Sequence, residues 1–303
     1  MESIKVASFY CFTKLGSIIH KQDTLRSRCQ DYGVKGLMIL AEEGINGTIA
    51  GEIKKVDLVI DYIRNIIKCD QINLKEAFTN KIPFGKIKTK IKKEIVTFGI
   101  DLSSLNENPG EYVEPNDWNV LINDENVVTI DTRNDYEYKI GTFRGAVNPQ
   151  TESFSDFPGW WKVNQVKYKG KAIAMFCTGG IRCEKSTKFL LKEGVKKVYH
   201  LKGGVLNYLE KYKGKKNQWE GECFVFDQRV SVGLNVKQGS CSLCFACRYP
   251  LKISELTHPQ YEEGVSCQYC YENTSQERKK SFRERQKQIK LSELKGEKHL
   301  KYF

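Results

Sequence analysis

The sequence predicts an α/β protein with several domains: a small α+β domain, a parallel α/β domain, and a cysteine-rich segment with a basic helical tail. The length of 303 residues exceeds what one ordinary hydrophobic core supports. Stretches with the apolar period of strands alternate with stretches that have the period of helices. Five of the 11 cysteines fall within residues 241–270. We therefore divide the chain into a first domain (1–98), a linker (99–118), a second domain (119–220) and a C-terminal segment (221–303).

The composition indicates packed cores and an excess of positive charge. Hydrophobic residues make up 40% of the chain, and no apolar run reaches the length of a membrane span, so we expect no membrane contact. The stretch from Met1 to Lys5 leads directly into strand-like sequence without an apolar leader, which predicts a cytoplasmic protein. The net charge of +12 favours a polyanionic partner, although AT-rich genomes also encode lysine-rich proteins. The sequence identifies no protein partner.

The first domain is predicted to follow the order βαββαβ. We expect strands at 5–12, 35–41, 47–51 and 71–77, helices at 22–32 and 54–68, and a turn at 42–46. The second helix carries an apolar stripe, formed by Val56, Val59, Ile60, Ile63 and Ile67. This order is that of the ferredoxin-like fold, which by itself indicates no function.

A lysine-rich extended stretch, residues 84–96, follows these elements. Every second residue in part of this stretch is a lysine, at Lys86, Lys88, Lys90 and Lys92. The two-residue period of a strand places these four ammonium groups on one face. Lysines in such a position either protect the edge of a sheet or contact RNA phosphates. Because like charges on one face repel unless an anion lies across them, we predict that these lysines bind RNA.

The second domain is predicted to contain a parallel sheet whose faces are covered by helices. The linker before it has little periodicity and several turn-forming residues: Pro109, Gly110 and Pro115. We then expect strands at 126–130, 171–176 and 198–201, and helices at 184–192 and from Gly203 onward. Strands that alternate with helices form parallel sheets, and ligands bind outside the carboxyl ends of those strands.

One of those carboxyl ends carries the candidate catalytic residue, Cys177. The strand ends there, and a loop follows before the next helix: Thr178, Gly179, Gly180, Ile181 and Arg182. The two glycines allow this loop to curl around the sulfur. Backbone N–H groups at a helix N-terminus and the charge of Arg182 both favour an anion, so we expect a reactive thiolate. The alternative is a free cysteine that packs at a strand end.

The loop and its surroundings resemble the rhodanese sulfurtransferase family. In that family the first cysteine of the loop carries a persulfide, and the arginine follows after four residues, as Arg182 follows Cys177. Further matching motifs occur earlier in the chain, namely Asp131-Thr132-Arg133 and Gly145-Ala146-Val147-Asn148. Gly141-Thr142-Phe143 departs mildly from the Gly-His-Ile of the family. The resemblance covers about residues 112–220 and implies a rhodanese fold with Cys177 at its active site.

A second cysteine, Cys183, lies six positions after Cys177. It could resolve an oxidised Cys177 by forming a disulfide, or it could pack in the helix as a small apolar residue. The sequence leaves both interpretations open.

The C-terminal segment carries a predicted metal site followed by a basic tail. Two Cys-x2-Cys pairs separated by 19 residues supply four thiolates suited to tetrahedral zinc: Cys244, Cys247, Cys267 and Cys270. Cys241 is left over, and Cys241 with Cys244 is the rival first pair. A redox pair or an iron–sulfur cluster is the alternative. Residues 277–301 are rich in lysine and arginine and form either a solvated helix or a nucleic-acid contact, of which we favour the second.

The combination of these parts resembles one family over essentially the full chain. The carrying motifs are Ala41-Glu42-Glu43-Gly44-Ile45-Asn46-Gly47-Thr48, the Cys177 loop and the Cys-x2-Cys tail. The family is that of the rhodanese-domain tRNA uridine-34 hydroxylases, which make 5-hydroxyuridine in the anticodon loop with molecular oxygen. The resemblance implies an oxidoreductase of the monooxygenase type that acts on tRNA. An anticodon loop offers unpaired bases that a basic protein can draw into a pocket.

The oxidation chemistry has no evident cofactor in the sequence. We find no flavin or nicotinamide motif, and the four histidines form no iron-binding pattern. We hypothesise that the Cys177 thiolate adds to C6 of uracil, which makes C5 a nucleophile for an oxygen donor. Arg182 and the loop amides would stabilise the anion. The rival functions are a persulfide sulfurtransferase, serving thiosulfate chemistry or tRNA thiolation, and a non-catalytic RNA-binding or redox-sensing protein.

Overall fold

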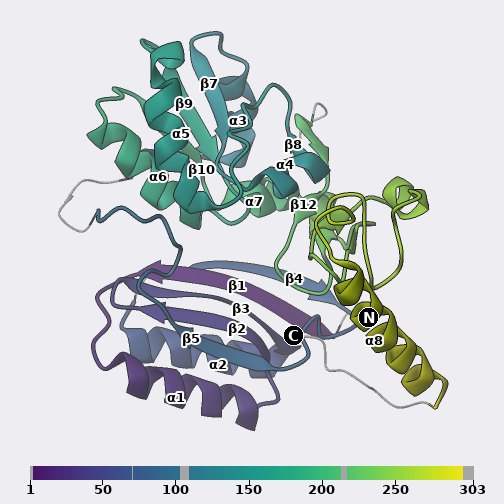
Figure 1. Ribbon diagram of the computed structural model, residues 1–303. Coiled ribbons are helices and arrows are strands. Elements are labelled where there is room, and N and C mark those ends of the chain that lie inside the picture. The colour runs from purple at the N-terminus through teal and green to yellow at the C-terminus, as the bar shows by residue number, and fades with distance from the viewer. Residues whose placement is uncertain (1–2, 70, 103–108, 213–216, 296–303) are drawn as a thin grey trace.

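The computed structural model describes residues 3–69, 71–102, 109–212 and 217–295, which form the three predicted parts (Figure 1). The first domain lies beneath the second, and the C-terminal segment lies at their side. Among the helices in these ranges, none is long and apolar enough to cross a membrane.

The first domain is a five-stranded sheet covered by two helices on one face. The strand order is β4-β1-β3-β2-β5, and the predicted βαββαβ order is confirmed before β5. The helices α1 and α2 lie together on one side of the sheet (Figure 1). The element bounds are β1 Ile4–Phe12, α1 Ile18–Asp31, β2 Lys35–Ala41, β3 Gly44–Glu52, α2 Ile53–Ile67, β4 Asn73–Thr79 and β5 Ile87–Ile91.

The core of the first domain lies between the sheet and these helices. The predicted stripe of α2 is buried in it, with Phe9 of β1 and Met38 of β2 on the sheet side. Ile87 of β5 also packs against this core. Because side chains alternate along a strand, the residues between these apolar ones point to the other face of the sheet. We call this the helix-free face, and it carries Ser8, Tyr10, Thr48, Lys75 and Lys88.

The turn between β2 and β3 is shorter than predicted. We expected a turn over residues 42–46, but the strand β3 already begins at Gly44, so only Glu42 and Glu43 form the turn. Gly44 pairs with Phe12 of β1, and a Cβ atom there would meet the carbonyl oxygen of Cys11 at 2.0 Å. Glycine is therefore required here because two strands approach closely. It does not belong to the turn, although glycine is common in turns.

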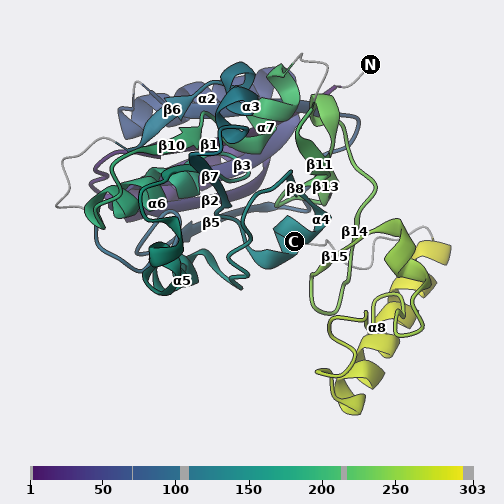
Figure 2. The same cartoon turned by 90° about the horizontal axis from the view of Figure 1, so that it is seen from above.

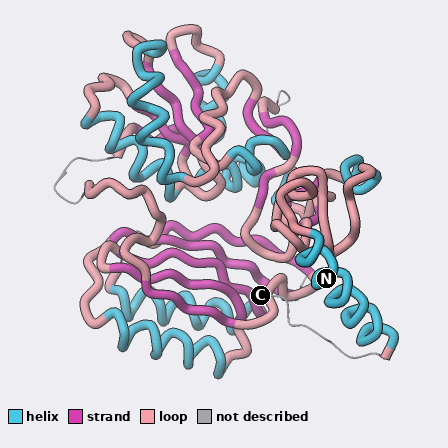
Figure 3. The backbone as a smooth tube through the Cα atoms, in the orientation of Figure 1, coloured by secondary structure: helices cyan, strands magenta, loops and turns pink. Residues whose placement is uncertain are grey.

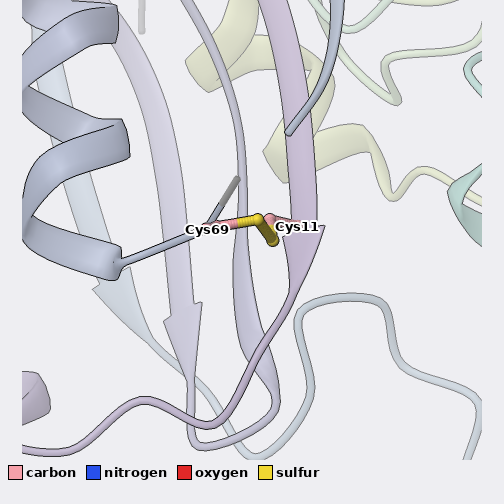
Figure 4. Close-up of a disulfide and its surroundings, with 2 residues drawn as sticks. All are labelled: Cys11 and Cys69. Atoms are coloured by element: carbon pink, nitrogen blue, oxygen red, sulfur yellow. A yellow bond between two sulfur atoms is a disulfide. The ribbon is translucent and has the colours of Figure 1, made fainter. Parts of the chain in front are cut away.

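A disulfide joins Cys11 of β1 to Cys69, which follows α2 (Figure 4). Their Cα atoms are 6.8 Å apart, and 58 residues separate them in the sequence. Both cysteines belong to the core of the first domain. The bond therefore connects the end of a central strand to the end of the helix that covers it.

The second domain contains the predicted parallel sheet, with strand order β6-β10-β9-β7. Its strands are β6 Glu111–Val113, β7 Val127–Asp131, β9 Ala172–Phe176 and β10 Val198–Leu201, with a separate pair of β8 Gly141–Phe143 and β11 Trp219–Gly221. Its helices are α3 Pro115–Ile122, α4 Asp135–Ile140, α5 Phe157–Asn164, α6 Ile181–Lys192 and α7 Gly204–Lys211.

The predicted linker is partly ordered as secondary structure of the second domain. The strand β6 pairs with β10, and α3 begins at Pro115, where proline suits the first turn of a helix. The lack of periodicity over 111–118 therefore reflects two short elements, whereas residues 99–102 and 109–110 form neither helix nor strand. Residues 103–108 of this stretch lie outside the described ranges.

The C-terminal segment consists of short strand pairs and loops followed by one long helix (Figure 3). The strands are β12 Cys223–Phe224, β13 Ser231–Val232, β14 Ser242–Leu243 and β15 Pro250–Leu251, and the helix is α8 Gln276–Leu294. Figure 2 shows α8 on the far side of this segment from the two domains. Arg283 of α8 pairs with Glu262 and Lys290 pairs with Glu263, which fastens the helix to the loops. The predicted basic helical tail is confirmed over Gln276–Leu294, and residues 296–301 of the predicted stretch lie outside the described ranges.

Candidate active site

The loop after β9 surrounds Cys177 as the sequence predicts. Cys177 is fully buried, and α6 begins at Ile181 with Gly180 as the residue before its first turn. The backbone amide of Gly180 donates a hydrogen bond to Cys177 Sγ at 3.1 Å. Gly180 has φ of 98°, a left-handed conformation that favours glycine. The glycine therefore turns its amide toward the sulfur.

The surroundings of Cys177 lower the pKa of its thiol to about 6. Burial alone raises this pKa, but a hydrogen bond from the Cys183 thiol, the charge of Arg182 and the amides of Cys183 and Arg182 outweigh burial. At pH 7 a thiol with this pKa is about 90% thiolate, whereas an ordinary cysteine is a few per cent thiolate. The lowered pKa therefore favours the thiolate form of Cys177 at neutral pH.

Arg182 is held by a carboxylate and acts on the sulfur through its charge. Its guanidinium donates to both carboxylate oxygens of Glu137, at 2.6 and 2.8 Å, and to Thr178 Oγ1 at 3.3 Å. Glu137 of α4 is fully buried and also accepts a hydrogen bond from the Thr178 hydroxyl at 3.0 Å. This two-pronged pair fixes the arginine and one side of the loop together.

Glu137 is a site residue that the sequence analysis did not select. Glu137 lies just after Asp131-Thr132-Arg133, in the stretch that resembles the rhodanese family. That resemblance is the sequence feature that could have identified it. Burial raises the pKa of its carboxyl, but Arg182 and Arg133 reverse this effect, and the net pKa is lowered. A second buried pair, Arg133 with Asp131 at 2.6 Å, lies beside it. Two buried ion pairs therefore support the loop.

Cys183 lies in the first turn of α6, fully buried beside Cys177. Its pKa is raised by burial and by the hydrogen bond that its thiol donates to the Cys177 thiolate. Thr132 Oγ1 is 3.7 Å from Cys183 Sγ. Cys177 and Cys183 belong to the same buried cluster, and the resolving role requires such proximity, whereas packing as a small apolar residue does not.

The first domain reaches the loop through Tyr10 of β1. The Tyr10 hydroxyl donates to Glu184 of α6 at 2.9 Å and accepts from Asn73 Nδ2 at 3.1 Å. A Cβ atom on Gly180 would lie 3.1 Å from this hydroxyl, so Tyr10 packs directly on the loop. Tyr112, which is 46% exposed, also donates to the Glu184 carboxylate. Sequence reasoning could not find Tyr10, because its partner lies 174 residues away.

Lys185 of α6 forms the second connection to the first domain. Its buried ammonium donates to Glu43 at 2.8 Å, to Glu94 at 2.6 Å and to the carbonyl oxygen of Val96. Glu43 also accepts the backbone amide of Ile95 at 2.7 Å. The Ala41–Thr48 motif thus joins the first domain to the helix of the thiol loop.

A third connection joins β4 to α7. Lys75 Nζ donates to the side-chain oxygen of Asn207 at 2.9 Å. Asn207 belongs to α7, whose first amides, of Val205 and Leu206, donate to the carbonyl oxygens of Cys177 and Thr178. Both helices that follow the loop are therefore in contact with the first domain.

The four predicted lysines lie at the edge strand β5, on the helix-free face or next to it. Lys88 and Lys90 belong to β5, which pairs with β2 alone, and Lys86 and Lys92 flank it. Lys86, Lys90 and Lys92 are exposed, and Lys88 is half-buried. This is the same face from which Tyr10 contacts the thiol loop and Lys75 contacts α7.

The structure brings together the four cysteines of the predicted metal site. The sulfur atoms of Cys244, Cys247, Cys267 and Cys270 all lie within 4.8 Å of one another. Cys241 lies outside this group, in a core of its own with Ile140, and its amide faces Glu222. The rival pair of Cys241 and Cys244 is therefore wrong, because Cys241 packs against the second domain.

Two family models match this chain. The UPF0176 acylphosphatase like domain matches residues 4–95, and the Rhodanese-like domain matches residues 114–211. These matches coincide with the first and second domains of the structure.

Several relatives match nearly the full chain, and each is named tRNA uridine(34) hydroxylase. The relative from Ruegeria pomeroyi is 51% identical over 97% of this chain and 98% of its own length. The one from Rhizobium leguminosarum is 46% identical over 97% and 96%, and the one from Roseobacter denitrificans is 47% identical over 95% and 97%.

Proposed function

Because this chain belongs to the tRNA uridine(34) hydroxylase family, we propose that it hydroxylates uridine 34 of tRNA in the cytoplasm, with Cys177 as the nucleophile and molecular oxygen as co-substrate. The observation that supports the role of Cys177 is its lowered pKa in a loop whose Gly180 amide donates to the sulfur. The reaction is that of an oxidoreductase of the monooxygenase type, with 5-hydroxyuridine as its product.

The proposed chemistry begins with addition of the thiolate to the base. A bond forms between Cys177 Sγ and C6 of uracil, and the electrons of the C5–C6 double bond move to C5 and the O4 carbonyl. C5 then bonds to one atom of molecular oxygen, and an external two-electron donor reduces the resulting C5 hydroperoxide to the C5 alcohol and water. Loss of the C5 proton and departure of the thiolate restore the double bond. Arg182 keeps the thiolate available throughout, because Glu137 fixes its charge beside the sulfur.

Cys183 is proposed as a resolving thiol for Cys177. A thiol hydrogen-bonded to a thiolate lies close enough to attack it if that sulfur becomes oxidised. Because the pKa of Cys183 is raised, it stays protonated and unreactive until that oxidation occurs.

The lysines at β5 are proposed to bind the RNA backbone, because they share the helix-free face that meets the thiol loop. Replacing Lys86, Lys88 and Lys90 by glutamine should weaken tRNA binding and reduce its log–log salt slope by about 0.7 to 0.9 per lost contact. Lys54→Gln, at an exposed position of α2 on the opposite side of the sheet, is the control. Equal slopes for wild type and the triple variant would show that these lysines only protect the sheet edge. We extend the proposed RNA contact to the basic helix α8.

The four clustered cysteines are proposed to hold a structural zinc. Four thiolates with no open position form a closed tetrahedral site, which contributes folding energy and no catalytic step. Zinc would join the loops that carry the two Cys-x2-Cys pairs. The helix α8 forms ion pairs with this part of the segment through Arg283 and Lys290.

The proposed function is tested by nucleoside mass spectrometry of tRNA from cells that lack this protein. We expect 5-hydroxyuridine and nucleosides made from it to disappear, and to return with the wild-type chain but not with Cys177→Ser. The rhodanese-like domain match keeps a persulfide sulfurtransferase as the second candidate. That enzyme would transfer sulfur from thiosulfate to cyanide without tRNA, and unchanged tRNA nucleosides together with this activity would replace our proposal.

A further inference from the structure

Lys75 has a neutral hydrogen-bond partner, whereas the other positive side chains near the thiol loop are paired with carboxylates. Arg182 is paired with Glu137, and Lys185 is paired with Glu43 and Glu94. Lys75 donates instead to the neutral amide oxygen of Asn207 at 2.9 Å. Its positive charge is therefore not cancelled by its hydrogen-bond partner.

The Lys75 ammonium lies against the backbone that supports the thiol. A Cβ atom on Gly203 would meet Lys75 Cε at 2.5 Å and Nζ at 2.7 Å, so the lysine occupies space that a glycine leaves open. Gly203 in turn lies 3.6 Å from the position of a Cβ atom on Gly180. Because the Gly180 amide binds Cys177 Sγ, the ammonium is connected to the sulfur through the backbones of two glycines, Gly203 and Gly180.

Asn207 fixes the position of Lys75 without neutralising it. Asn207 is only 1% exposed, and its Nδ2 donates to the carbonyl oxygen of Lys202 at 2.7 Å. That bond orients the amide so that its oxygen faces Lys75. An aspartate at this position would cancel the charge of Lys75, although it would also lose the N–H group that donates to the Lys202 carbonyl oxygen.

The charged groups that act most strongly on Lys75 are Lys202, Lys211, Glu114 and Glu210, and Lys202 is paired with Glu114 at 2.5 Å. Glu76 and Arg229 line the same small pocket as Lys75, and each is paired with another side chain, Lys5 and Asp227 respectively. Burial, followed by repulsion from Lys211, lowers the pKa of Lys75, so an arriving anion would relieve an unfavourable charge.

We propose that Lys75 binds a backbone phosphate of the RNA beside the uridine that reaches Cys177. The proposal rests on the proposed function for the identity of the RNA and adds the contact nearest the reaction. Lysine binds phosphate as a point charge, and this one is half-buried, so water screens it less than the exposed lysines of β5.

The register of the sheet connects Lys75 with the lysines of β5. Lys75 lies opposite Ser8, Ser8 opposite Thr48, Thr48 opposite Leu37, and Leu37 opposite Lys88. This row crosses four strand spacings, or about 19 Å, on the helix-free face. An RNA strand along the row would have one phosphate at the thiol loop and others at the edge of the sheet.

The test compares RNA binding by three variants of the full chain with that of the wild type. The probe is an anticodon stem-loop RNA with uridine at position 34, and affinity is measured between 50 and 200 mM salt. We expect Lys75→Gln to bind about tenfold more weakly at the lower salt, as for loss of one hydrogen bond to a charged group. Its salt slope should fall by about 0.7, one contact to a single strand. Asn207→Asp should reproduce both changes, and the control Lys54→Gln should show neither.

Wild-type affinity and slope in Lys75→Gln would overturn the proposal, as would an equal loss in Lys54→Gln. Glutamine retains an N–H donor for Asn207, and circular dichroism of each variant verifies that the fold is kept. Product formation by the wild-type chain is measured separately. A chain that binds this RNA through Lys75 but forms no 5-hydroxyuridine would contradict the proposed function and support this contact.

Discussion

The hydrogen bond between the two buried thiols predicts how the reactivity of Cys177 responds to substitution. Among the interactions that lower the pKa of Cys177, the bond from Cys183 is the largest. Cys183→Ala removes this donor, whereas Cys183→Ser keeps a donor of similar size. Both substitutions remove the possible resolving thiol, so a difference between them reports on the hydrogen bond alone.

The size of the effect follows from the strength of such a bond. A hydrogen bond to a charged group contributes about 1.5–3 kcal/mol, and one pKa unit corresponds to about 1.4 kcal/mol. Cys183→Ala should therefore raise the pKa of Cys177 from about 6 by about one to two units. At pH 6.5 the thiolate fraction would fall about threefold to 25-fold. Cys183→Ser should remain close to the wild type.

The assay is the rate of Cys177 alkylation by iodoacetamide as a function of pH, followed by mass spectrometry of the peptide. Because Cys177 is fully buried, the pH of the half-maximal rate is compared and not the absolute rate. The same profile in the alanine and serine variants would refute the reasoning. A midpoint in the wild type near that of an ordinary cysteine would also refute it.

Three further predictions concern the loop, the metal site and the buried ion pair. Cys177→Ser should abolish 5-hydroxyuridine formation and leave tRNA binding intact, because a hydroxyl fits the loop but does not ionise near neutral pH; a normal rate of product formation would exclude a thiol mechanism. Cys247→Ser should reduce bound zinc, measured by elemental analysis, from about one per chain and make the C-terminal segment sensitive to protease. Its control Cys241→Ser should keep the metal, and equal zinc in both variants would argue against the assigned ligands. Glu137→Gln should lower the free energy of unfolding in urea by about 3–5 kcal/mol, because it leaves a buried arginine unpaired. Glu220→Gln, in an exposed pair, should change it by less than about 1 kcal/mol, and similar losses in both would contradict this account.

The parts of the site that the sequence predicted are those whose residues lie close together along the chain. The Cys177 loop and the two Cys-x2-Cys pairs are of this kind, since each spacing restricts the local geometry. The apolar period likewise predicted α2 and β9 to within a residue of their bounds. Patterns among residues close in sequence were therefore enough to predict the thiol loop, the helix after it and the cysteine cluster.

The contacts between domains could not be predicted, because the paired residues are far apart and polar. Tyr10 and Glu184 are 174 residues apart, and Lys75 and Asn207 are 132 apart. A tyrosine in a strand or a lysine at its edge has the same local pattern whether it meets solvent or another domain. The Cys11–Cys69 disulfide escaped prediction for a related reason, since two isolated cysteines carry no spacing signal.

The first turns of the helix α6 contact both domains, so the surroundings of the thiol loop depend on the first domain as well as the second. Arg182 and Cys183 face the second domain, whereas Glu184 and Lys185 bind groups supplied by the first. If residues 109–221 were grafted into another protein, Lys185 would lose both carboxylates and Glu184 would lose the Tyr10 hydroxyl. The transplanted loop would then differ in charge next to the sulfur even if its backbone were unchanged. A transplanted second domain should therefore be accompanied by the whole first domain, because Tyr10, Glu43 and Glu94 lie in three different parts of it.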